Sequence, residues 1–176
     1  IAEGAVVLQT GKRLTPADLG ILASLGFGEI SVKRRPKVAF FSTGDELRAI
    51  GETLQPGELY DSNRYTLYGM LQRAGVELID LGVVRDEPDA LKEAFEQAAE
   101  AADVVLSTGG VSVGEADYTK SILQSLGEIG FWQIAMKPGR PLTFGRLDRA
   151  LFFGLPGNPV AVMVSFYQFV LPALHA

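Results

Sequence analysis

The chain has 176 residues, 47% of them apolar, which is enough for one substantial core but too little for two large domains. Its net charge is −5, its basic residues are scattered, it has no cysteine, and its single histidine, His175, is second-last. These features exclude a nucleic-acid surface, disulfides, zinc–thiolate centres and histidine-based triads, while the absence of a long apolar run or a signal peptide predicts a cytoplasmic protein without membrane contact.

Residues 1–33 predict a small appendage with one helix. Thr15 is a good N-cap, Pro16 suits the first helical position, and Gly26 is placed to end the helix. A charged run at 33–36 is interpreted as a linker. Because the chain opens without Met and closes on an apolar helix, we expect it to be part of a longer protein. We divide it into the end of an N-terminal region, 1–33, and an α/β domain, 34–176.

From Lys37 onward, short apolar runs alternate with amphipathic patterns. The apolar runs predict strands at 38–42, 76–82, 104–107 and 131–136, and a hairpin that pairs 142–144 with 151–153. Helices are predicted to begin at Asp61 or Ser62, after Asp86, near Tyr118 and after Pro159. The repetition predicts an α/β fold of three layers, a mostly parallel sheet with helices on both faces. Ligands of such sheets bind beyond the carboxyl ends of the strands.

Three glycine-bearing loops follow predicted strands: T-G-D-E from Thr43, T-G-G-V-S-V-G from Thr108 and L-P-G-N-P from Leu155. Each alone could be an ordinary connector, but three at one sheet edge predict a phosphate pocket, because glycine lets backbone N–H groups approach an anion. The helices predicted near Tyr118 and Pro159 would point their positive ends at the same place. The predicted binding residues are Thr43, Gly44, Ser107, Thr108, Gly109, Gly110, Ser112, Gly114, Pro156, Gly157 and Asn158.

Three carboxylates, those of Glu46, Asp86 and Asp117, stand at or just beyond strand ends on the same predicted rim. Beside a phosphate they would repel the ligand unless a cation lay between, and Mg²⁺ binds one or two carboxylates together with phosphate oxygens. The sequence therefore predicts a magnesium site. N-capping of the following helix is an equally good reading of Asp86 and a weaker one of Asp117.

The K-P-G-R-P segment places Lys137 and Arg140 on either side of a turn that prolines make rigid. Two cations on a stiff loop suit an oxyanion, although isolated surface charges remain an alternative. The segment from Tyr60 to Asn63 is as good a helix start as a ligand contact.

These motifs together resemble a known family. In chain order, S-T-G-D-E-L, Y-D-S-N, G-G-V-S-V-G-E-A-D-Y, K-P-G-R-P and G-L-P-G-N-P are similar to the molybdopterin-binding domain of the MoeA/gephyrin family, the molybdopterin molybdenumtransferases. The resemblance runs from Lys37 to the end, and residues 1–33 look like the segment that precedes this domain. It implies a longer chain, with an earlier start and a small C-terminal β domain.

The resemblance implies a reaction: adenylylated molybdopterin and molybdate, with Mg²⁺, give a pterin dithiolene that carries molybdenum, and AMP is released. By position, it assigns catalysis or metal binding to Glu46, Asp86 and Asp117, and catalysis to Lys137. Ser112, Arg140 and Pro141 fall where the family is thought to hold the oxyanion. Gln133 stands where close relatives often carry Lys, and Arg140 replaces a Lys, which changes a point charge into a fork of donors.

Partners and alternatives follow from the same resemblance. It implies a homodimer and contact with the molybdopterin adenylyltransferase. That adenylyltransferase shares the domain and is itself an alternative identity, but its chains lack a segment like 1–33, so the appendage favours the insertase. A non-catalytic, gephyrin-like scaffold is a second alternative, and the intact acidic residues argue against it. A nucleotide-repair enzyme on this fold is disfavoured by G-E-A-D-Y.

Overall fold

The computed structural model describes residues 1–109 and 116–176, with side chains described for all of these except 116–118, 131 and 132. The chain forms two compact units, Ile1–Arg34 and Arg35–Ala176. Among the described helices, none is both long and apolar enough to cross a membrane.

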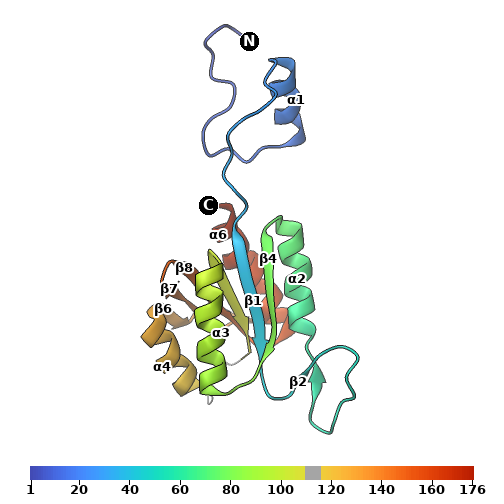
Figure 1. Ribbon diagram of the computed structural model, residues 1–176, viewed down its shortest axis with the longest axis vertical. Coiled ribbons are helices and arrows are strands. Elements are labelled where there is room, and N and C mark those ends of the chain that lie inside the picture. The colour runs from blue at the N-terminus through green and yellow to red at the C-terminus, as the bar shows by residue number, and fades with distance from the viewer. Residues whose placement is uncertain (110–115) are drawn as a thin grey trace. The chain divides into compact units, whose positions relative to one another are not determined.

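The first unit contains one helix, α1 (Pro16–Ser24), as its sequence predicts (Figure 1). Thr15 and Asp18 form a capping box, in which the Thr15 hydroxyl accepts from the Asp18 N–H and the Asp18 carboxylate accepts from the Thr15 N–H. The Lys12 ammonium also bonds this carboxylate and, with the bonds from Thr15, lowers the pKa of Asp18 to about 2. The helix therefore begins at a well-defined residue.

The second unit is built on a six-stranded sheet in the order β4–β1–β5–β8–β7–β6 (Figure 1). Its parallel part consists of β4 (Glu77–Val84), β1 (Lys37–Thr43), β5 (Val104–Thr108) and β8 (Ala150–Leu155). β7 (Pro141–Leu147) runs antiparallel to β8 in the predicted hairpin and also to β6 (Gly127–Gln133) at the edge. The expectation of a mostly parallel sheet is confirmed.

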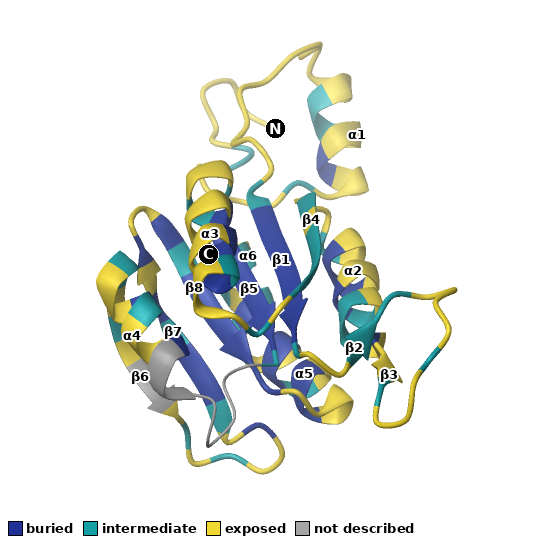
Figure 2. Cartoon of the chain, turned by 60° about the horizontal axis from the view of Figure 1, so that its bottom comes forward, coloured by how far each residue is buried: buried dark blue, intermediate teal, exposed yellow. Residues whose placement is uncertain are grey.

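Both faces of this sheet are covered, and β1 shows why (Figure 2). Val38 and Phe40 point to the face covered by α2 (Ser62–Ala74) and by a C-terminal segment made of α5 (Pro159–Ser165), the π-helix η1 (Phe166–Val170) and α6 (Leu171–His175). Ala39 and Phe41 point to the face covered by α3 (Pro88–Ala101) and α4 (Ala116–Leu126). Because side chains alternate along a strand, a fully apolar run fills two cores at once. The predicted three layers follow.

Helix ends agree with their sequence signals in most places. Asp61 caps α2 by accepting from the Arg64 N–H, and Gly75 ends that helix in the left-handed conformation. Of the two readings of Asp86, N-capping of the next helix is not the one found, since the N-cap of α3 is Glu87, with Pro88 at the first helical position. Pro88 fixes the start one residue later, and the Asp86 carboxylate makes other contacts instead, one of them with Thr43.

Two further elements differ from expectation. β6 begins at Gly127 rather than 131, because its ladder with β7 sets its length and not the apolar run alone. A short parallel ladder of β2 (Leu47–Arg48) and β3 (Leu59–Tyr60) lies between β1 and α2, where the sequence predicts no strand. Two-residue strands leave no periodic pattern to detect.

Phe95 at the centre of α3 is expected to be essential for stability. It is buried, and its ring meets those of Phe41 and Phe152 edge-on at centroid distances of 5.2 and 5.5 Å. Phe95→Ala should reduce the free energy of unfolding by about 3–5 kcal/mol, because it leaves a cavity among rigid rings. Chemical denaturation measures this. Glu93→Ala, at an exposed position of the same helix, serves as the control and should change it by less than about 0.5 kcal/mol; equal losses would contradict the packing described.

Candidate functional site

A pocket of about 460 Å³ lies beyond the carboxyl ends of β1, β5 and β8. The first, second and third glycine-bearing loops all contribute to it, together with the loop that precedes β7. Its lining residues are Thr43, Gly44, Glu46, Gly109, Pro138, Gly139, Pro141, Pro156, Gly157, Asn158 and Ala161. Eight of the predicted site residues are among these, and they come from four separate parts of the sequence.

Strand register places the pocket there. Ser42 pairs with Thr108, and Thr108 pairs with Leu155, so the three parallel strands end at the same level. The chain leaves β1 towards β4 on one side, whereas β5 adds to the other side of β1. Such a reversal of strand order opens a crevice between two diverging loops, which is where open α/β sheets bind ligands.

Gly109 is required by the closeness of two of these loops. It has φ +86°, and a β-carbon there would collide with the carbonyl oxygen of Thr43. Only glycine combines this backbone conformation with this approach. The loop after β5 is thus packed directly on the end of β1.

Two acidic residues of the predicted metal site each contact the loop that follows β1. Glu46 lines the pocket, with its carboxylate beside Gly44, where a β-carbon would lie 2.7 Å from the Glu46 Oε2. Asp86 does not line the pocket, but its Oδ1 accepts from the Thr43 hydroxyl at 3.5 Å and its N–H donates to the Asp45 carboxylate at 3.2 Å. Among the residues whose side chains are described, which do not include Asp117, no group of three His, Cys or acidic residues is placed to hold a metal by itself.

The predicted cations flank the pocket without lining it. Part of the pocket wall is formed by Pro138, Gly139 and Pro141. Lys137 precedes these residues, Arg140 lies between Gly139 and Pro141, and both cations are exposed. Neither cation forms an ion pair with any carboxylate that the structure describes. Both charges therefore remain available to a ligand at the rim.

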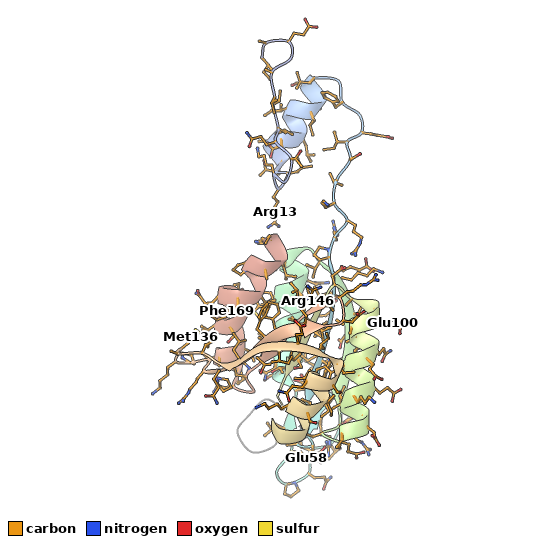
Figure 3. All side chains as sticks on the ribbon, turned by 90° about the vertical axis from the view of Figure 1, so that its left-hand side faces the viewer. Arg13, Glu58, Glu100, Met136, Arg146 and Phe169 are labelled. Atoms are coloured by element: carbon orange, nitrogen blue, oxygen red, sulfur yellow. The ribbon has the colours of Figure 1, made fainter. Side chains whose placement is uncertain are left out.

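The segment 137–140, here called the cationic loop, packs against two side chains, those of Met136 and Ser165. A β-carbon on Gly139 would collide with the Met136 methyl and lie 3.0 Å from the Ser165 hydroxyl, so the loop packs closely on α5. Figure 3 labels Met136, which lies in the segment that follows β6. Gln133 pairs with Pro141 across the β6–β7 ladder, so Gln133 borders the pocket wall.

Several predicted residues support the pocket from below or lie outside the described chain. Ser107 and Thr108 are buried under it rather than exposed to it. Asp117 belongs to α4, but its side chain is among those not described. Gly110, Ser112 and Gly114 lie outside the described residues.

Asn63 is a residue that the sequence signals only weakly. Its side-chain N–H₂ group donates to the Gly157 carbonyl at 2.8 Å and to the Thr108 hydroxyl at 3.1 Å, and that hydroxyl donates to the Pro156 carbonyl at 3.0 Å. The side chain thus joins α2 to two loops of the pocket. Only the Y-D-S-N motif points to it, and a helix start explains that motif equally well.

Asn158 has a different role from the one its helix suggests. Its side-chain oxygen accepts from the N–H groups of Val160 and Ala161 at 3.0 and 3.2 Å, and Pro159 has no N–H. The first turn of α5 is therefore capped from within the chain, and these helical donors are not offered to a ligand. What the segment presents to the pocket is the backbone of Gly157 and Asn158.

Residues 39–176 match the family described as "Probable molybdopterin binding domain". The chain belongs to this family of molybdopterin-binding domains. A molybdopterin molybdenumtransferase of Haemophilus influenzae is 49% identical over 174 residues, 99% of this chain and 43% of that protein. One of a Nostoc species is 45% identical over 176 residues, 98% of this chain and 40% of that protein. The resemblance to the MoeA/gephyrin family is thereby confirmed.

Solved structures agree with this assignment. The molybdopterin biosynthesis MoeA protein of Pyrococcus horikoshii is 37% identical and superimposes with a TM-score of 0.82 over 96% of this chain and 42% of that one. The molybdopterin-binding domain described here therefore spans less than half the length of these three relatives.

Gly109 offers a direct test of the pocket geometry. Gly109→Ala is expected to lower the free energy of unfolding by roughly 2–5 kcal/mol, since it adds a steric collision to the cost of positive φ. Gly57→Ala is the matched control, because Gly57 has φ +92° but open space around its β-carbon, and it should lose only about 1–2 kcal/mol. Denaturation curves of both variants give the comparison, and equal losses would show that the two loops are not in contact.

Proposed function

We propose that the protein to which this molybdopterin-binding domain belongs inserts molybdate into adenylylated molybdopterin and releases AMP, and is thus a transferase of molybdenum cofactor biosynthesis. One observation carries the proposal: four loops with the family's motifs meet at a single pocket. The relatives that share these motifs are named molybdopterin molybdenumtransferases. Thr43, Gly44, Gly109 and Gly157 would contact the substrate directly, over a floor that contains Ser107 and Thr108.

A role for Mg²⁺ fits the donors in the described chain. Glu46 lines the pocket. Asp86 does not, but its carboxylate accepts a hydrogen bond from Thr43, which is part of the pocket wall. Mg²⁺ is bound by protein carboxylates together with phosphate oxygens and water, so a complete protein cage is not required. We assign Glu46, Asp86 and Asp117 to hold it. When bound, the ion would neutralise phosphate charge and polarise the bond to AMP.

The cationic loop supplies the remaining charge. Lys137 and Arg140 stand beside the pocket without carboxylate partners among the described residues, so they are free to attract an oxyanion. We assign Lys137 to the departing or reacting phosphate, and Arg140, Pro141 and Ser112 to molybdate. Gly110, Ser112, Gly114 and Asp117 complete the set by resemblance.

We further propose that the protein acts in the cytoplasm as a homodimer that receives its substrate from the adenylyltransferase. An exposed apolar patch on the second unit supports the dimer. Helices α2 and α5 pack side by side, and η1 continues α5. These three elements present exposed apolar side chains, each more than 40% exposed: Tyr65, Tyr68, Val160, Met163 and Tyr167. A patch of this kind on adjacent helices is typical of an interface.

AMP release tests the proposed reaction. The full-length protein, given adenylylated molybdopterin, molybdate and Mg²⁺, should release AMP. A protein that releases no AMP from this mixture but forms pyrophosphate from ATP and molybdopterin would instead be an adenylyltransferase. Glu46→Gln should raise the Mg²⁺ concentration for half-maximal release by at least about tenfold, because it removes a charged ligand. Glu52→Gln, at an exposed position in the loop between β2 and β3, is the control. Unchanged magnesium dependence in Glu46→Gln would remove this residue from the metal site.

The dimer has its own test. Met163→Glu places a charge in the middle of the α2–α5 patch and should raise the dimer dissociation constant by more than about tenfold in sedimentation experiments. Ile50→Glu alters an exposed apolar residue outside the patch and should leave the dimer intact. Equal effects of the two variants would mean that the patch is not the interface.

A further inference from the structure

Asn63 is connected by hydrogen bonds to two peptide groups of the pocket wall. Its amide nitrogen lies between the Gly157 carbonyl, which can only accept, and the Thr108 hydroxyl, whose own hydrogen is directed at the Pro156 carbonyl. These acceptors fix which way the Asn63 amide points. Thr108 is 1% exposed, so its hydroxyl has no water to bond with instead. Asn63 and Thr108 therefore form a directed chain of hydrogen bonds that ends on the L-P-G-N-P loop.

Planar peptide geometry carries this orientation to the other side of the loop. The bonds Pro156–Gly157 and Gly157–Asn158 are trans, so each N–H points opposite to the preceding carbonyl. The carbonyls of Pro156 and Gly157 face Thr108 and Asn63, and the N–H groups of Gly157 and Asn158 consequently face away from them. Neither N–H donates to any residue in the described chain.

Both residues line the pocket, so an acceptor there would meet two adjacent backbone donors. The reverse orientation would present two carbonyl oxygens to the same space and repel an anion. These donors belong to the loop before α5 and are distinct from the helix's own first N–H groups, which Asn158 caps.

We infer that Asn63 is a positioning residue: through Thr108 and the Gly157 carbonyl it turns the N–H groups of Gly157 and Asn158 towards a tetrahedral oxyanion in the pocket. The oxyanion is either a phosphate group of the substrate or molybdate. The role of Asn63 in the reaction rests on the proposed function, whereas its role in oxyanion binding does not.

The experiment follows the Gly157 and Asn158 amide resonances of the ¹⁵N-labelled chain during titration with inorganic phosphate and, separately, with molybdate. At least one anion should shift both resonances, and comparison of the two affinities identifies which anion the site prefers. Asn63→Leu and Thr108→Val are neutral and close in size to the native residues, and each should weaken this binding by about tenfold or more. Thr108→Ser retains the hydroxyl and should restore the affinity lost in Thr108→Val.

Ser62→Ala is the matched control, because Ser62 is an exposed neighbour in the same helical turn. Thermal unfolding of every variant identifies any general loss of structure. Wild-type resonances that do not respond to either anion, or an undiminished response in folded Asn63→Leu and Thr108→Val, would overturn the inference. Failure of AMP release in the full-length protein, with the anion shifts intact, would overturn the proposed function and leave the role of Asn63 standing.

Discussion

The level ends of β1, β5 and β8 are the constraint on which the site depends. Each strand is apolar on both faces, so a slip of one residue would exchange the side chains of the two cores. Val38 and Phe40 would then face the α3 side, and Ala39 and Phe41 the α2 side, with volumes that fit neither. Burial therefore fixes the register, and the register brings Thr43, Thr108 and Leu155 to one edge. The loops that follow these strands lie close together because packing in the two cores sets the strand register.

An anion pocket in a chain of net charge −5 requires local geometry in place of overall attraction. The described wall supplies this with backbone groups and with two rim cations that have no carboxylate partner in the described structure. Glu46 and Asp86 oppose the anion by their charge, and this conflict is what favours a divalent cation between them and the ligand. Under the proposed function, the same carboxylates that repel an anion at the empty site would become ligands of the cation once it is bound together with the phosphate.

Much of the fold was predictable because its signals are local. The helix ends are marked by residues within one turn of them, namely the N-caps Thr15 and Asp61 and the C-cap Gly75. The apolar run of β1 indicates a strand buried on both faces. The convergence of the glycine loops was also predictable, because it follows from strand order alone. The role of Asp86 was not predictable. An aspartate just after a strand can either cap the next helix or contact Thr43, and only the position of Pro88 decides between these roles.

Asn63 shows a second limit of reading a single sequence. Its partners lie 45 and 94 residues away, and no spacing rule connects an amide in a helix to two loops at such distances. The contact exists because α2 packs on the face of the sheet where Thr108 and Gly157 meet it. Helix α2 packs on the sheet through its apolar face, and this packing places the polar side chain of Asn63 beside the loops. The N–H groups of Gly157 and Asn158 are therefore oriented in the absence of a ligand. Donors fixed in this way do not have to reorganise on binding, which is the condition under which backbone N–H groups hold an anion most effectively.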